Sequence, residues 1–151
     1  MTSPRPCRNV GLANSWESTL AKELVISSDL KAAREAERIV LGEVARWGYT
    51  SSARFAIRLA LEESFNNAIN HGNRRDPKKQ VTIAFDVDET CFTITIADRG
   101  EGFDPSVVPD PRADENLEKP SGRGIMLMRA YMDEVRFNKK GNQVQMIKRN
   151  K

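Results

Sequence analysis

The amino-acid sequence predicts an α+β domain, a two-layer α/β sandwich in which helices cover one face of a mixed, mostly antiparallel sheet. The first half of the chain carries apolar residues at helical spacing, and the middle switches to strict two-residue alternation. Helices and strands segregated in this way are typical of this fold class. The 151 residues suffice for one domain with a full core. We expect a flexible leader at residues 1–16 and the domain at residues 17–151.

A short strand and a first helix open the domain. Residues 23–28 contain a run of apolar, mostly β-branched side chains and predict a strand. Ser28 or Asp29 then caps a helix, because short polar side chains accept hydrogen bonds from the first free backbone N–H groups. Apolar residues recur along this helix at helical spacing, and Gly48 ends it.

A second helix follows almost directly. Ser51 or Ser52 is its expected N-cap, and its apolar residues form a stripe that faces the core. We expect the helix to run to about His71 and to stop at Gly72, since glycine commonly ends helices.

The rest of the chain is predicted to be mainly sheet. Residues 81–87 and 92–96 alternate apolar and polar side chains around a short polar turn, which indicates an antiparallel hairpin with one face on the core. Residues 105–120 are polar, rich in proline and without periodicity, which is typical of a loop that serves as a lid or of a disordered segment. A further helix and two strands are expected at residues 124–132, 134–137 and 144–148.

The composition excludes several classes of protein. The net charge of +3 is too small and too dispersed to predict nucleic-acid binding. No stretch approaches the roughly 18 apolar residues of a membrane helix, and the amino terminus lacks the apolar core of a secretory signal. We expect a cytoplasmic protein without a nucleic-acid or membrane partner. Cys7 and Cys91 show no metal-ligand spacing, and we expect free thiols rather than a disulfide.

The second helix carries a dense stripe of acid and amide side chains. Glu63, Asn67 and His71 are four residues apart and follow one face, with Asn66 and Asn70 beside them. Oxygen ligands of this kind suit Mg²⁺, so Asn67 is a candidate metal ligand, and Glu63 is a candidate general base. A solvated helix face explains the stripe equally well. For His71, a role as helix cap is favoured over metal binding.

Asp98 stands at the end of the second strand of the predicted hairpin and is followed by Gly100 and Gly102. Two glycines let the backbone approach a flat ligand closely, and the carboxylate can accept a hydrogen bond from the exocyclic amine of adenine. Taken alone, the segment is more typical of a plain turn, in which aspartate and glycine are common.

Gly122, Arg123 and Gly124 open the next helix. Free N–H groups and the positive end of the helix dipole make such a helix start an anion site, and Arg123 and Lys119 are candidates for contacts with phosphate. A glycine-bearing linker before a core helix is the alternative. The sequence contains neither a Walker A motif nor a dinucleotide-binding fingerprint after a strand.

Together and in this order, the three segments resemble the motifs of the histidine-kinase-like ATPase superfamily, and the resemblance extends over roughly residues 23–148. It implies the Bergerat ATP-binding fold. The N box and the two glycine boxes of that superfamily are matched by Glu63-x-x-x-Asn67, Asp98-x-Gly100-x-Gly102 and Gly122-x-Gly124.

Within the superfamily the chain is most similar to the small bacterial anti-sigma factor serine kinases, through residues 122–135. This resemblance implies a homodimer that binds ATP and Mg²⁺, holds a sigma factor inactive and phosphorylates a serine on an antagonist protein of the STAS type. Three alternatives stay open: a binding module that uses ATP only as a ligand, a switch kinase for partners other than sigma factors, and a catalytic fragment that acts on histidine.

The resemblance also implies residue roles. Glu63 would be the general base for the substrate serine, Asn67 would hold Mg²⁺, and Asp98 would bind the adenine amine. Residues 105–121 would form the ATP lid. Some relatives carry an arginine just before the second glycine box, where Pro120 stands here. The nucleotide-binding residues implied are Asn67, Asn70, His71, Asp98, Gly100, Gly102, Gly122, Arg123 and Gly124.

Overall fold

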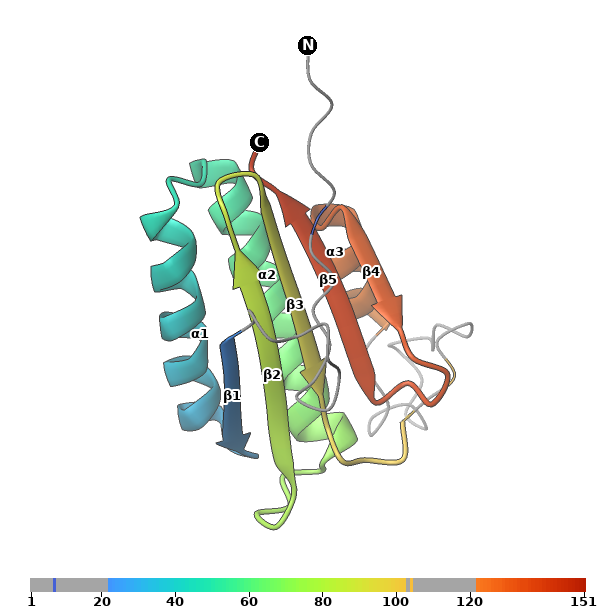
Figure 1. Cartoon of the computed structure of the whole chain (residues 1–151). Helices are drawn as coiled ribbons and strands as arrows, with labels where there is room; N and C mark the ends of the chain where they lie inside the picture. The colour runs from blue at the N-terminus through green and yellow to red at the C-terminus, as the bar shows by residue number, and fades with distance from the viewer. Residues whose placement is uncertain (1–6, 8–21, 103, 105–121) are drawn as a thin grey trace.

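The computed structural model describes Cys7, residues 22–102, Asp104 and residues 122–151. In these ranges, five strands and three α-helices follow one another in the order expected for an α+β fold (Figure 1). The elements are β1 (Lys22–Ser27), α1 (Leu30–Arg46), α2 (Ser51–Asn66), the π-helix η2 (Asn67–Gly72), β2 (Gln80–Val87), β3 (Cys91–Ala97), α3 (Gly122–Tyr131), β4 (Glu134–Phe137) and β5 (Gln143–Arg149).

The strands form one sheet in the order β1-β2-β3-β5-β4, and every strand pair among the described residues is antiparallel. The β2–β3 hairpin has the predicted alternation, with Ile83 opposite Ile96 and Phe85 opposite Ile94. Figure 1 shows α1, α2 and α3 together on one face of this sheet. The predicted two-layer sandwich is therefore confirmed.

The core lies between the two layers. Apolar side chains of the helices meet those of β2, β3 and β5 there, because residues that alternate along a strand point to the same face. The largest fully buried side chains are Phe85, Phe92, Ile57, Leu61, Ile69, Ile83, Ile94, Ile96, Ile125, Met128 and Met146.

The helix caps explain where the first two helices begin. Asp29, one of the two expected caps, accepts a hydrogen bond from the Ala32 N–H at 2.8 Å. For α2 the expected caps, Ser51 and Ser52, are wrong: the Thr50 hydroxyl accepts from the Ala53 N–H at 3.0 Å. Thr50 has extended backbone angles and stands just outside the helix, whereas both serines already lie inside it.

The prediction of free thiols is also wrong, because Cys7 and Cys91 form a disulfide with their Cα atoms 5.6 Å apart. Cys91 precedes Phe92, which lies in the core, so its own side chain points to the sheet face away from the helices. The bond therefore attaches the amino-terminal residue Cys7 to that second face of the sheet.

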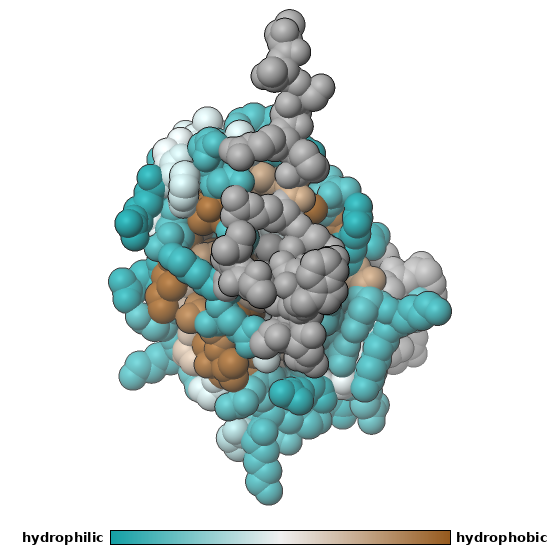
Figure 2. Space-filling view, in the orientation of Figure 1, coloured by the Kyte–Doolittle hydropathy of each residue, from teal (hydrophilic) through white to brown (hydrophobic). Residues whose placement is uncertain are grey.

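The face of the molecule shown in Figure 2 is mainly polar. Figure 2 shows mostly hydrophilic side chains on the face that it displays, interrupted by apolar side chains beside the edge strand β1, where Val25 is 53% exposed. Within the described ranges, no helix is long and apolar enough to cross a membrane.

Candidate nucleotide and phosphoryl-transfer site

The acid-and-amide stripe occupies the junction between α2 and η2. Glu63 lies half-buried in the last turn of α2, and the half-buried Asn67 is the first residue of η2. The expected α-helix to His71 is corrected here, because α2 ends at Asn66 and the next six residues form a π-helix. Its wide turn is closed by a hydrogen bond of 2.8 Å from the Asn73 N–H to the Ala68 carbonyl. Wide turns of this kind occur frequently at functional sites.

Asp98 and two glycines bring the end of η2 and the loop after β3 into close contact. A Cβ atom on Gly72 would overlap the Asp98 carboxyl group, and a Cβ atom on Gly100 would overlap the Gly72 carbonyl oxygen. The Gly100 N–H donates to Asp98 Oδ1 at 2.7 Å, which fixes the carboxylate. Only residues without side chains permit this approach, so the structure brings the end of the N box and the first glycine box into contact.

Burial raises the pKa of Asp98 from 3.8 to about 6. The hydrogen bond from Gly100 and the charges of Lys79 and Lys140 act in the opposite direction and limit the rise. The result is a desolvated carboxylate that lacks a bonded cation among the described residues and can accept a hydrogen bond from a neutral donor. An exocyclic amine on a flat base meets that requirement.

Asn73 is a site-forming residue that sequence reasoning missed. Its side chain is fully buried, and its Oδ1 accepts from the Arg99 N–H at 2.7 Å. Its Nδ2 donates to Ser28 Oγ at 2.8 Å and to the Gln80 carbonyl at 3.1 Å. This one amide therefore joins η2, the start of β2 and the loop after Asp98. The only signal in the sequence was an asparagine directly after Gly72, which is typical of an ordinary helix end.

Gly102 has a φ of +81°, and a Cβ atom there would overlap the carbonyl oxygen of Lys140. The absence of a side chain at Gly102 therefore lets the loop after β3 pack directly on the turn between β4 and β5. On the other side of that turn, the Asp98 N–H donates to the Asn142 carbonyl at 2.9 Å. Both contacts fix the loop that follows β3 against the turn between β4 and β5.

Helix α3 packs on α2 in the antiparallel direction. The buried Ser64 hydroxyl contacts Met128 Sδ at 3.1 Å and Met146 Sδ at 3.4 Å, so it ties α2 to both α3 and β5. At the other end, the rings of Phe55 and Tyr131 stack edge to face with centroids 5.7 Å apart. Because the carboxyl end of α3 lies beside the amino end of α2, the amino end of α3 points toward Asn67.

The second glycine box, at the amino end of α3, therefore lies at the same end of α2 as Asn67. Gly122 is the first residue of α3, Arg123 is exposed and Gly124 is buried. The predicted lid, residues 105–121, lies outside the described part of the chain, as do Lys119 and Pro120.

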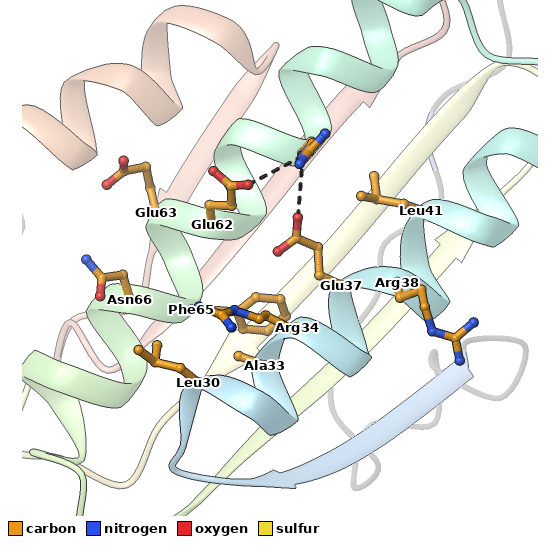
Figure 3. Close-up of a pocket in the computed structure, with 11 residues that line it drawn as sticks. Leu30, Ala33, Arg34, Glu37, Arg38, Leu41, Glu62, Glu63, Phe65 and Asn66 are labelled. Carbon is orange, nitrogen blue, oxygen red and sulfur yellow. Dashed lines mark hydrogen bonds and ion pairs between the residues drawn. The ribbon is translucent and has the colours of Figure 1, made fainter.

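A groove of about 570 Å³ separates α1 from α2 next to Glu63 (Figure 3). Arg58 bridges its two walls, 3.8 Å from Glu37 on α1 and 3.4 Å from Glu62 on α2. Glu63 and Asn66 line the groove from the α2 side. Glu63 therefore lies at the edge of this groove, and Figure 3 shows its carboxylate pointing away from Glu37 on α1.

The residues fit a nucleotide with its metal ion. The desolvated Asp98 carboxylate is an acceptor that suits the amine of a flat base, and His71 has a buried Nδ1 without a hydrogen-bond partner in the described residues. Within those residues, no three His, Cys, Asp or Glu side chains form a metal cluster. Asn67 is the one candidate metal ligand that the stripe offers, and Mg²⁺ commonly keeps few protein ligands beside phosphates and water.

Comparisons with known proteins agree with this arrangement. Residues 26–148 match the family model described as histidine kinase-like ATPase domain. The chain is 34% identical over 121 residues to the serine-protein kinase RsbW of Bacillus subtilis, covering 74% of both proteins. It is 32% identical over 108 residues to RsbW of Oceanobacillus iheyensis, covering 67% of this chain and 68% of the relative. An anti-sigma F factor of Halalkalibacterium halodurans is 33% identical over 104 residues, covering 66% of this chain and 70% of the relative.

A solved structure shows the same fold. The RsbU and RsbW domains of a Mycobacterium tuberculosis protein superpose with a TM-score of 0.59 at 17% identity, over 88% of this chain and 32% of that one. The chain thus spans about a third of that larger protein. Since a family model matches most of its residues and curated relatives exceed 30% identity, the chain belongs to the histidine kinase-like ATPase domain family, in the group of the serine-protein kinases RsbW.

Proposed function

We propose that this protein binds ATP at the Asp98 pocket and transfers its terminal phosphoryl group to a serine of a partner protein. The observation that supports the proposal is the close contact between Gly72 and Asp98, which brings the Asp98 carboxylate to the end of η2, the helix that continues α2 and begins with Asn67. The kinase activity agrees with the names of the curated relatives.

Asp98 would select adenine. Its carboxylate accepts a hydrogen bond from the exocyclic amine, whereas guanine presents a carbonyl oxygen at the equivalent position and would be repelled. Gly72, Gly100 and Gly102 would let the ring lie against the backbone. His71, whose Nδ1 is buried without a partner among the described residues, would face the same ligand.

Asn67 would hold Mg²⁺, which neutralises phosphate charge when bound. The backbone N–H groups of Gly122 and Gly124 at the start of α3 would donate to phosphate oxygens, and exposed Arg123 would add a charge-assisted contact. Phosphoryl transfer needs mainly positioning and charge neutralisation, and these groups supply both.

Glu63 would accept the proton of the substrate hydroxyl as the serine oxygen forms its bond to phosphorus and the bond to ADP breaks. The position of Glu63 supports this role, because its side chain is only half-buried and lies at the edge of the groove between α1 and α2.

The partners belong to the same proposal. By similarity to the anti-sigma F factor and RsbW, the protein would sequester a sigma factor and phosphorylate its antagonist of the STAS type, which then releases it. We propose that it acts as a homodimer in the cytoplasm, where ATP is available. Light scattering of the purified protein tests the dimer directly.

The Glu63→Gln variant tests the chemistry, because it keeps the shape of the side chain and removes its basicity. We expect unchanged binding of Mg·ATP and a loss of transfer by a factor of about 10²–10⁴. Transfer is measured with γ-labelled ATP and a STAS-type antagonist purified from the same organism. Glu134→Gln, at an exposed residue of the edge strand β4 outside the groove, is the control and should retain transfer.

One outcome would replace the kinase with a binding module. If the wild type and Glu63→Gln both bind ATP, and neither transfers phosphate to any candidate antagonist, then ATP serves only as a ligand for partner exchange.

A further inference from the structure

The loop after η2 contains two consecutive non-glycine residues with left-handed backbones. The φ angles of Arg74 and Arg75 are 52° and 58°. Residues with side chains rarely adopt this conformation, and strained positions cluster at functional sites. The turn is held by hydrogen bonds of 2.8 Å from the Arg75 N–H to the Ile69 carbonyl and of 3.0 Å from the Asp76 N–H to the Asn73 carbonyl. These bonds maintain the unfavourable conformation.

The strained turn brings the Arg75 guanidinium back to the helix of the N box. Arg75 Nε donates to Asn70 Oδ1 at 2.6 Å. Asn70 Nδ2 in turn donates to Asn66 Oδ1. An exposed arginine thereby fixes the side chain of Asn70, which is half-buried one turn beyond Asn66 on the face that carries Glu63.

The chemistry of the two groups determines the orientation of this amide. A guanidinium has only hydrogen-bond donors, so it can meet the oxygen of Asn70 but not the nitrogen. The Asn70 nitrogen carries two N–H donors, of which one is used by Asn66. The other N–H has no partner in the described part of the chain. An amide rotated by 180° would present its oxygen there instead, and an oxygen repels phosphate.

We propose that Arg75 is a positioning residue for the triphosphate and acts through Asn70. It holds the Asn70 amide so that the second N–H donates to a phosphate oxygen of ATP. This inference rests on the proposed function, because it needs ATP in the site. It adds a residue outside the three motifs and assigns a purpose to the strained backbone at Arg74 and Arg75.

Calorimetry with Mg·ATP and with AMP tests the inference, because AMP lacks the outer phosphates that Asn70 would meet. Arg75→Gly removes the guanidinium and also suits the left-handed backbone, so the fold should not lose stability. We expect about five- to tenfold weaker ATP binding and an unchanged affinity for AMP, as one charge-assisted hydrogen bond is lost. Arg75→Lys, which also has only donors, should restore most of the ATP affinity.

Arg74→Gly is the matched control, since it removes an equal charge from an equally left-handed neighbour that does not bond Asn70. It should bind ATP as the wild type does. The inference is wrong if Arg75→Gly binds ATP normally, if Arg74→Gly weakens ATP to the same extent, or if Arg75→Gly weakens ATP and AMP equally. If the wild type binds neither nucleotide, the proposed function itself fails and this inference fails with it.

Discussion

The carbonyl oxygen of Gly72 lies so close to the α-carbon of Gly100 that a single methyl group between them would overlap that oxygen. Gly72 ends the π-helix, and Gly100 belongs to the loop that follows β3. Two segments that are separated in the chain thus touch through their backbones. The contact fixes the distance between Asp98, which would read the base, and Asn67, which would hold the metal ion.

Gly100→Ala should therefore damage both stability and binding. Its methyl group would meet a backbone carbonyl that cannot rotate away, and overpacking of this kind costs about 1–3 kcal/mol of unfolding free energy. ATP affinity should fall because the loop must move away from Gly72. Urea unfolding and calorimetry measure the two effects.

Gly42→Ala provides the control for that variant. Gly42 lies within α1, and a Cβ atom there meets nothing within 4 Å. Alanine in a helix interior should raise the free energy of unfolding by about 0.5–1 kcal/mol and leave ATP binding unchanged. If Gly100→Ala behaves as Gly42→Ala does, the close contact at Gly72 is unimportant.

Asp98→Asn should separate stability from function. The pKa of Asp98 is raised from 3.8 to about 6 by burial, so the unfolded chain binds fewer protons between these values and the free energy of unfolding falls as pH rises through them. Asparagine removes this penalty. We expect the variant to melt at a higher temperature than the wild type at pH 7.5 and the difference to shrink toward pH 4.5.

The same variant should bind ATP much more weakly. The Gly100 N–H would hold the amide oxygen, so the amide nitrogen would face the adenine amine and offer it no acceptor. A more stable protein that no longer binds ATP would agree with a desolvated, functional carboxylate. Lower stability together with normal ATP binding would contradict the role assigned to Asp98.

Binding of ATP should also depend on pH. The ionised Asp98 is a stronger acceptor for the adenine amine than the protonated acid, so affinity should fall as pH drops through about 6. Between pH 7.5 and pH 5 we expect about a tenfold loss of ATP affinity. The pKa of Asp98 lies about one unit above pH 5, so only about a tenth of the carboxylate stays ionised at that pH. Glu63→Gln should show the same profile, and a flat profile in either protein would exclude Asp98 as the titrating group.

The disulfide should contribute to stability and leave the nucleotide site intact. Cys7 and Cys91 are 84 residues apart, and a crosslink that closes so long a loop destabilises the unfolded chain by about 4.5 kcal/mol in the chain-entropy model. Reduction or Cys7→Ser should lower the free energy of unfolding in urea by an amount approaching this value.

The Cys7→Ser variant also supplies the internal control. Its unfolding should no longer respond to a reducing agent, and its ATP affinity should equal that of the wild type, because Cys91 and Asp98 stand at opposite ends of β3. Equal stability of the oxidised and reduced wild type would show that the bond adds nothing to the fold. Alkylation of thiols in freshly lysed cells reports whether the bond forms in the cell.

Local patterns in the sequence predicted most of the fold. The alternation around Ile83 and Ile94 identified the hairpin, and the polar residues at positions 28 and 29 located the start of α1 within one residue. The cap of α2 was missed because Thr50, Ser51 and Ser52 are all capable of capping. Which of them does so depends on where the helix begins, and local propensity does not locate the start of a helix to within one residue.

Features that depend on distant contacts could not be predicted. The Cys7–Cys91 bond joins positions with no local relationship, and Asn73 acquires its role only when three segments surround it. The π-helix at Asn67 also escaped, since it differs from an α-helix only in which carbonyl each N–H reaches. The roles of the site residues remain predictions, although their motifs were visible in the sequence.

Calorimetric titration of the purified wild type with Mg·ATP tests the central claim most directly. We expect one molecule of ATP per chain and no comparable binding of GTP, because Asp98 accepts from an amine that guanine lacks at that position. Absence of any heat of binding with ATP at about 1 mM, or equal binding of GTP, would contradict the convergence of Glu63, Asn67 and Asp98 around one adenine nucleotide.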